Sequence, residues 1–325
     1  MSTAADPTAV PAAGRRAPCP CGSGKRWKAC HGSASGAAAV RPVARPFQGL
    51  AGEPQLVAMR EVLPSATAPL TLSEQARAVG PTPTVLLATV LPLGWPALVR
   101  RDGTVLLAAQ STVRSGDASR DLAWVLEAAL AAGPGPVTRT GLPVPGPRLQ
   151  DLLRVDADLP VTVHAGVDFW TEGLGDEVGS DPEVAAALER TSSSVTPTEQ
   201  VDVPAGHASV ARLGSRDSLR WVLPYHDAAG PGAEERRVDA LARVAASDGL
   251  ALPDLDGGRF VGAFRAAGLL VPVWDVPEGA RPDELTEPAR AFWDRLVDRE
   301  ADESPLSPVE RAARGGVLSR QLTLR

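Results

Sequence analysis

The chain places its three cysteines in one short stretch near the N-terminus. In PCPCGSGKRWKACHG, residues 18–32, Cys19, Cys21 and Cys30 are followed directly by His31. Zn²⁺ prefers four soft or borderline ligands in a tetrahedron, and three thiolates with one imidazole form such a closed set. Because four protein ligands leave no position for water, the spacing predicts a structural zinc site rather than a catalytic one. A chance cluster or a redox function is the alternative interpretation.

The run CPCGSGKRWKACH resembles the SEC-C motif, the zinc-binding tail of the preprotein translocase motor, which also occurs in unrelated proteins. All four ligand positions and the GSGK turn match, and Trp27 stands where the family more often has tyrosine or phenylalanine. The resemblance implies Zn²⁺ as the cofactor. In the translocase the motif is C-terminal and contacts an export chaperone, whereas here it is N-terminal.

The turn of this motif is followed by a basic cluster with one aromatic side chain. Lys25, Arg26, Trp27 and Lys28 form it, and Lys25 and Lys28 are the only lysines of the chain. Basic side chains around an aromatic ring suit an acidic protein surface or an RNA backbone. The SEC-C resemblance favours the protein-export or nascent-chain machinery, that is the translocase or the ribosome. The alternative is a knuckle whose charges are only solvated.

The charge distribution supports this assignment of the partner-binding residues. The formal net charge is −6, yet the first forty residues hold five basic side chains and only one acidic residue, Asp6. The remainder of the chain therefore carries all of the acidic excess. A basic arm on an acidic body favours an acidic partner for the arm, and it restricts nucleic-acid binding to the arm.

The sequence predicts four regions. Residues 1–17 form a disordered tail that lacks the apolar run of a secretory signal. Residues 18–32 form the knuckle, and residues 33–45, which are small and polar, form a flexible linker. Residues 46–325 form the body, with a Pro/Gly-rich connection at 133–148 marking a subdivision near 133–180. No stretch reaches the roughly 20 apolar residues that cross a bilayer, so we expect a cytoplasmic protein.

Residues 46–325 alternate between helical and strand patterns. We expect largely antiparallel sheets with packed helices, an α+β fold, because hairpin signals are frequent and strands alternate with polar positions. The expected hairpins join across Asp102-Gly103 and between 207–214 and 218–225. The expected helices cover 54–63, 122–132, 181–189, 234–246, 259–268 and 289–297, with a capping box at Ser307–Glu310. The order helix, hairpin, helix occurs twice, around 54–132 and 182–246, although no matching residues support a duplication.

The body as a whole resembles an uncharacterised domain family of high-GC Gram-positive bacteria. The stretches that carry the resemblance span nearly all of it and include RPFQGLAGEPQLVAMREVLPSATAPL, RFVGAFRAAGLLVPVWDV and the terminal SRQLTLR. No activity is assigned to that family, so the resemblance implies a category without a mechanism.

No catalytic signature emerges from the sequence. His164 and Asp168 are four residues apart on an expected strand, where they could serve as base and orienting group, but two polar positions on a solvated face are the better explanation. We therefore expect a zinc-binding, non-enzymatic adaptor. The alternative is an enzyme whose site in the body is assembled only by the fold.

Overall fold

The computed structural model describes residues 26, 42–76, 83–110, 115–138, 146–172, 181–214, 216–225, 232–253, 255 and 257–319. The chain divides into two compact units, Met1–Pro42 and Val43–Arg325. The second unit contains the body, and the description below concerns this unit alone.

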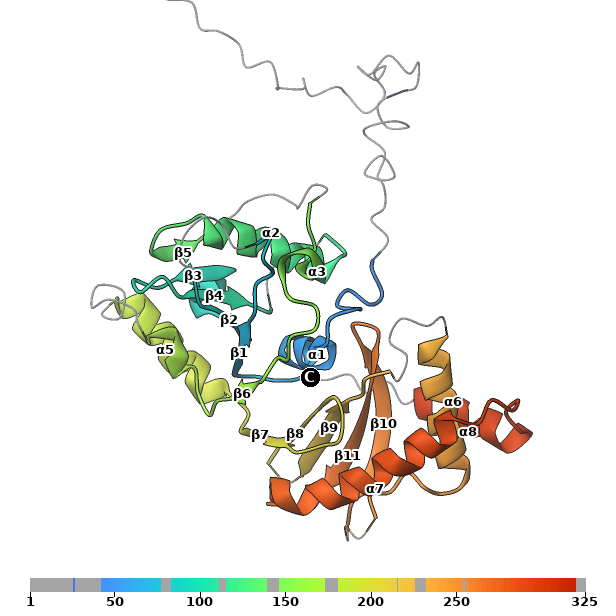
Figure 1. Ribbon diagram of the computed structural model, residues 1–325. Helices are drawn as coiled ribbons and strands as arrows, with labels where there is room; N and C mark the ends of the chain where they lie inside the picture. Colours follow the sequence, from blue (N-terminus) through green and yellow to red (C-terminus); the bar gives the residue numbers. More distant parts are fainter. Residues whose placement is uncertain are drawn as a thin grey trace, which may run out of the picture. The chain divides into compact units, whose positions relative to one another are not determined.

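The first half of the second unit is built on a six-stranded sheet (Figure 1). Its strand order is β5-β3-β4-β2-β1-β6, in which β2 and β4 pair in parallel and the other neighbours are antiparallel. The strands are β1 (Ala66–Leu70), β2 (Val85–Ala88), β3 (Ala97–Val99), β4 (Val105–Ala108), β5 (Gly135–Val137) and β6 (Thr162–Val163). The expected hairpin at Asp102-Gly103 is confirmed, with the Asp102 carboxylate accepting from the Thr104 N–H at 2.8 Å.

Helices cover both faces of this first sheet. On one face α2 contributes Leu122, Val125, Leu126 and Ala129 to a core shared with α1, and its N-terminus is capped by the Asp117 side chain. On the other face the η3 segment and α5 bury Phe169, Trp170 and Ala187. The helical elements of this half are α1 (Glu53–Glu61), η2 (Pro92–Gly94), α2 (Ala118–Leu130), α3 (Leu149–Leu152), η3 (Asp168–Trp170) and α5 (Pro182–Ser194).

The second half is built on a five-stranded sheet in which all neighbours are antiparallel. Its order is β10-β11-β9-β8-β7. The strands are β7 (Thr198–Val201), β8 (His207–Arg212), β9 (Asp217–Val222), β10 (Arg259–Ala266) and β11 (Leu269–Val276). The β8–β9 hairpin confirms the second expected hairpin. Together with the helices, the two mostly antiparallel sheets confirm the predicted α+β class.

The prediction of a helix over residues 259–268 is wrong. Residues Arg259–Ala266 form strand β10, which pairs with β11 through a tight turn at Ala267 and Gly268. Both turn residues have positive φ, and a Cβ on Gly268 would approach the Ala44 carbonyl oxygen to 2.7 Å, so glycine is required there. Pairing with the strongly apolar β11 decides the conformation of a segment whose local pattern suited a short helix.

Three helices accompany the second sheet: α6 (Ala233–Ala246), α7 (Pro282–Glu300) and α8 (Pro308–Ser319). Trp274 meets the ring of Phe292 on α7 edge-on, with ring centroids 4.9 Å apart. The expected capping box of α8 is confirmed, because the Ser307 N–H donates to Glu310 Oε2 at 2.7 Å and the Glu310 N–H donates to Ser307 Oγ at 3.3 Å. Within the described residues, no helix is long and apolar enough to cross a membrane.

One of the three hydrophobic clusters of the second unit spans both halves. Val57 and Met59 of α1 belong to the same buried cluster as Val222 and Val271 of the second sheet. Gln55 of α1 donates from Nε2 to the Gly206 carbonyl at 3.2 Å. The two sheets nevertheless differ in strand order and in their pairing, since only the first contains a parallel pair. The repeated order of elements in the sequence therefore does not give two equivalent sheets.

The leading segment, residues 43–50, contacts both halves. On the side of the first half, the Pro46 carbonyl accepts from Arg148 Nη2 at 2.8 Å and from Gln150 Nε2 at 2.9 Å. On the side of the second half, the Arg45 guanidinium lies over the Tyr225 ring, 4.7 Å from its centroid. Phe47 is fully buried between these contacts. The first residues of the second unit are thus part of its core.

Candidate functional sites

The predicted zinc and partner-binding residues lie mostly outside the described residues. Only Arg26 is described, and its side chain is exposed. The others are Cys19, Cys21, Lys25, Trp27, Lys28, Cys30 and His31. In the part of the chain that the structure describes, no three His, Cys, Asp or Glu side chains are placed to hold a metal ion. The fit of zinc therefore depends on donor chemistry, and three thiols with one imidazole suit Zn²⁺.

His164 and Asp168, the candidate acid–base pair, do not lie on one strand as expected. His164 follows the two-residue strand β6, and Asp168 begins the η3 segment. His164 Nε2 lies 2.8 Å from the Thr67 hydroxyl oxygen, a hydrogen-bond distance, and its ring packs against Phe169. Among the described residues, no hydrogen bond joins the Asp168 carboxylate to the imidazole. The structure pairs the histidine with a threonine instead of the predicted aspartate.

The environment of His164 favours the neutral imidazole. Partial burial lowers its pKa below the ordinary value, while the carboxylates of Glu172 and Asp168 act in the opposite direction. A neutral ring bonded to a hydroxyl can accept the hydroxyl proton, which a nucleophile–base pair requires. Such a pair also needs a group that orients the ring, and the described residues supply none at hydrogen-bond distance from the second ring nitrogen.

Thr67 could not be connected with His164 from the sequence. The two residues are 97 positions apart, and only the pairing of β1 with β6 brings them together. Arg100 fixes the neighbouring η3 segment by donating from Nη2 to the Phe169 carbonyl at 2.7 Å. The site therefore lies at the edge of the first sheet, where β6 is the outermost strand.

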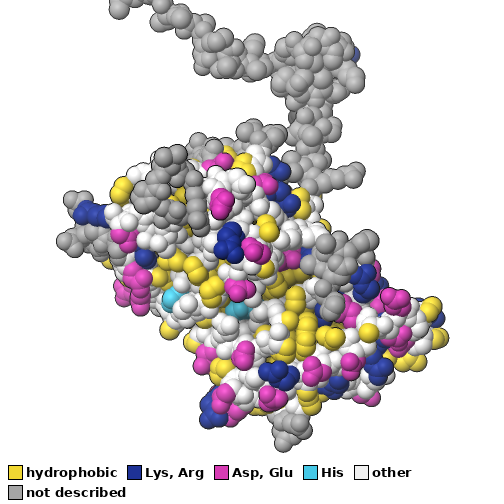
Figure 2. Space-filling view, viewed as in Figure 1, with side chains coloured by type: hydrophobic (Ala, Val, Ile, Leu, Met, Phe, Trp, Pro, Cys, Tyr) yellow, Lys and Arg dark blue, Asp and Glu magenta, His cyan; other side chains and the backbone are white. Residues whose placement is uncertain are grey.

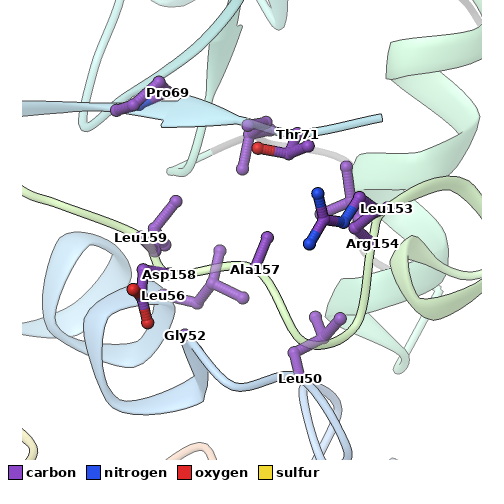
Figure 3. A pocket seen from close by; sticks show the side chains of 11 residues that line it. Leu50, Gly52, Leu56, Pro69, Thr71, Leu153, Arg154, Ala157, Asp158 and Leu159 are labelled. Carbon is purple, nitrogen blue, oxygen red and sulfur yellow. The ribbon is translucent and has the colours of Figure 1, made fainter. Parts of the chain in front are cut away.

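A small apolar cavity lies between α1, β1 and the segment that follows α3 (Figure 3). Its volume is about 20 Å³, which is room for about one water molecule. Leucine side chains dominate its lining: Leu50, Leu56, Leu70, Leu153 and Leu159. A cavity of this size does not accept an organic substrate.

A larger and open groove of about 540 Å³ is lined by residues of α6, α8 and the preceding loop. Glu235 and Asp239 face Arg311 and Arg314 across it, and Arg314 pairs with Asp239 at 2.6 Å. Because the acidic and basic groups are equal in number, the lining has no net charge with which to select a charged ligand.

Comparison with known families gives two matches. Residues 15–33 match the SEC-C motif, and residues 46–325 match a family of unknown function, DUF5926. The second match covers most of the chain, so the chain belongs to the DUF5926 family. Both resemblances inferred from the sequence are thereby confirmed. No curated protein and no solved structure is similar enough to match the chain.

Proposed function

We propose that this protein is a zinc-binding, non-enzymatic adaptor of the cytoplasm, whose N-terminal knuckle contacts a macromolecular partner. The observation that carries the proposal is the SEC-C match at residues 15–33. All four ligand positions of the motif are filled, by Cys19, Cys21, Cys30 and His31, and the chain has no other cysteine. A reducing compartment keeps such thiols available for metal.

Zinc would supply the folding energy of the knuckle. A unit of about fifteen residues is too short to bury a hydrophobic core, so metal binding contributes on the order of 10 kcal/mol to its folding. The part of the predicted linker that precedes Val43 would leave the knuckle free to reach a partner as a tethered unit, because residues 43–45 already contact the body.

The basic cluster of the knuckle supports an acidic partner. Lys25, Arg26 and Lys28 surround Trp27, and a knuckle of this size offers the indole ring little shelter. On the body, by contrast, Figure 2 shows basic and acidic side chains interspersed over the visible face. The partner we propose is an acidic protein surface or the ribosome, within the export or nascent-chain machinery to which the SEC-C motif points.

The alternative function, an enzyme with its site in the body, would depend on His164. The bond from His164 Nε2 to Thr67 gives it a base and a hydroxyl. The group that should orient the ring, Asp168, makes no hydrogen bond to it within the described residues. The adaptor therefore has the better support.

Native mass spectrometry tests the metal. Protein purified without chelator should carry one zinc per chain, and the double variant Cys19→Ser, Cys21→Ser should lose it because two ligands cannot close a tetrahedron. The matched control is Ser33→Ala, Ser35→Ala in the linker, which should keep the metal. Stoichiometric zinc in the cysteine variant would refute the assignment.

Co-sedimentation with ribosomes and with translocase tests the partner. Binding should weaken steeply between 0.1 and 1 M salt, as the Debye length falls from about 10 Å to about 3 Å. The variant Lys25→Glu, Lys28→Glu should abolish binding while zinc stays bound. The variant Arg190→Glu, Arg299→Glu reverses two exposed charges on α5 and α7 of the body and should bind as the wild type does. An equal loss of binding in both variants would show that binding depends on the overall charge of the protein and not on the knuckle.

A further inference from the structure

One face of the second sheet carries a row of polar side chains. The strand register aligns Gln200 of β7, Ser209 of β8, Arg220 of β9 and Val273 of β11 as cross-strand neighbours. Their side chains share one face, because alternate residues along a strand point to opposite sides. The other face of the sheet buries Trp221, Trp274 and Leu219 against the helices. The three polar members of this row, Gln200, Ser209 and Arg220, therefore lie on the face away from that aromatic core, the face on which Val222 and Val271 pack in the cluster of α1.

Arg220 lacks a counter-ion in the part of the chain that the structure describes. Its Nε is buried without a hydrogen-bond partner, and no carboxylate offsets the effect of burial, which lowers the pKa of the guanidinium. Other arginines of the same sheet are paired: Arg212 with Asp217 at 2.6 Å and Arg259 with Asp275 at 2.9 Å. Arg220 is thus a half-buried cation that the described protein leaves uncompensated.

Two serines lie beside Arg220 on this face of the sheet. Ser209 is directly opposite Arg220 on β8, where paired Cβ atoms are about 5 Å apart, and Ser218 lies two residues along β9 on the same face. Both serines are buried residues. Gln200, which is exposed, extends the row at the sheet edge. Hydroxyl and amide donors beside a planar guanidinium fork are the groups that bind oxyanions.

The nearest acidic residue in the register does not supply the missing counter-ion. Asp275 is opposite Ser218 on the same face. Its Oδ2 atom already pairs with Arg216 at 3.3 Å and with Arg259 at 2.9 Å. The carboxylate of Asp275 is therefore neutralised by two exposed arginines, and the charge of Arg220 remains.

We infer that Arg220, with Ser209, Ser218 and Gln200, forms a binding site for a small oxyanion, a phosphate or carboxylate group. The fork of a guanidinium matches the spacing of two oxygens of either group. An uncompensated cation in a partly buried position destabilises the fold until an anion neutralises it. The site belongs to the body and does not depend on the zinc knuckle or on the proposed adaptor function.

Calorimetric titration of the full chain with inorganic phosphate, and separately with acetate, tests the site at constant ionic strength. We expect saturable binding of one anion per chain for at least one probe, and the stronger probe identifies the ligand class. Arg220→Met should weaken binding about tenfold or more, the usual effect of losing charged hydrogen bonds. Arg220→Lys, which keeps the charge without the fork, should give an intermediate loss.

The matched control is Arg216→Gln, which removes the same charge beside the same strand from a side chain that is 67% exposed. It should bind as the wild type does, and so should Lys25→Glu, Lys28→Glu, which excludes anion binding at the basic arm. A loss in Arg216→Gln equal to that in Arg220→Met would overturn the site. So would the absence of saturable binding for both probes.

A second measurement covers the case in which Arg220→Met fails to fold. Ser209→Ala, Ser218→Ala keeps the charge and the side-chain volume within one atom at each position, and it should weaken binding severalfold. The bound anion should also raise the unfolding temperature of the wild type and not that of Arg220→Met, since a ligand stabilises only the form that binds it. An equal rise in both proteins would refute the role of Arg220.

Discussion

The two sheets of the second unit differ in the polarity of the residues on their faces. The central strands of the first sheet, β2 and β4, read VLLA and are apolar on both faces, because α1 and α2 cover one side and η3 with α5 cover the other. The second sheet carries polar residues on one of its faces: Leu219 and Trp221 face the helices, while Ser218 and Arg220 face the opposite side, where Val222 and Val271 pack in the cluster of α1. The central strands of the first sheet therefore offer no polar side chain to a ligand, whereas β8 and β9 of the second sheet offer Ser209, Ser218 and Arg220.

The two halves are also joined, by α1 and by the leading segment, residues 43–50. Glu53 of α1 accepts from both Arg45 Nε at 2.7 Å and Arg45 Nη2 at 2.5 Å, and both side chains are largely buried. The same arginine lies over Tyr225 of the second half. Desolvation raises the pKa of Glu53 despite this ion pair. The two sheets are therefore joined by buried contacts of α1 and the leading segment.

Truncation should have the largest effect. Deleting residues 1–40 should leave the free energy of unfolding of the body nearly unchanged, since the linker offers little apolar surface. Deleting residues 1–50 removes the fully buried Phe47 and leaves Glu53 buried without Arg45, which should lower stability by more than about 5 kcal/mol. Urea unfolding of the two truncated proteins measures the difference. A large loss on deleting 1–40 would show that the knuckle docks on the body.

Core truncation tests whether the sheets unfold together. Trp274→Ala in the second sheet and Leu106→Ala in the first each remove a fully buried side chain, with expected losses of about 3–5 and 2–5 kcal/mol. Because one hydrophobic cluster includes residues of both halves, each variant should shift a single transition seen by calorimetry. Trp274→Phe, which keeps an aromatic ring, is the milder control. Two separate unfolding transitions in either variant would contradict the expectation that the two sheets unfold together.

Lowering the pH should reduce the free energy of unfolding through protonation of His207, at the start of β8. Burial lowers its pKa from 6.5 to about 4, so the unfolded chain binds a proton between these values and the folded chain does not. Stability from this group is complete above pH 6.5 and is lost as pH falls, by about 2 kcal/mol between pH 7 and pH 5. His207→Gln should remove that part of the slope in urea unfolding at the two pH values. An unchanged slope in His207→Gln would contradict this expectation. His164→Gln, whose imidazole is less buried, should change the slope less.

The smallest expected effect is a difference in stability between variants of two arginines of the second sheet, Arg212 and Arg220. Arg212→Met leaves the buried carboxylate of Asp217 without its ion pair and should lower stability by about 1–3 kcal/mol. Arg220→Met removes a cation that has no partner in the described residues, so stability should change by no more than about 0.5 kcal/mol or rise. Thermal unfolding in the absence of phosphate and acetate gives the comparison. A loss at Arg220 equal to that at Arg212 would indicate a structural arginine.

Several elements were predicted correctly because they depend on residues that are close together in the sequence. The Asp102-Gly103 turn, the capping box of Ser307 and Glu310, and the amphipathic helix α2 each depend on residues within one or two turns of the chain. The prediction for residues 259–266 was wrong for the opposite reason, because their conformation depends on pairing with β11. The parallel pairing of β2 with β4 was missed in the same way, since no short-range pattern specifies which strands become neighbours.

By itself the sequence determined the donor set at Cys19, Cys21, Cys30 and His31, the basic cluster beside it, and the α+β class of the body. Ligand type, ligand spacing and hydrophobic periodicity are properties of neighbouring residues, so they can be read along the chain. Only the tertiary structure decided that His164 meets Thr67 and that Arg220 has no counter-ion among the residues that the structure describes. Those facts depend on which strands pair and on what lies beyond a side chain, and both are set by contacts between residues far apart in sequence.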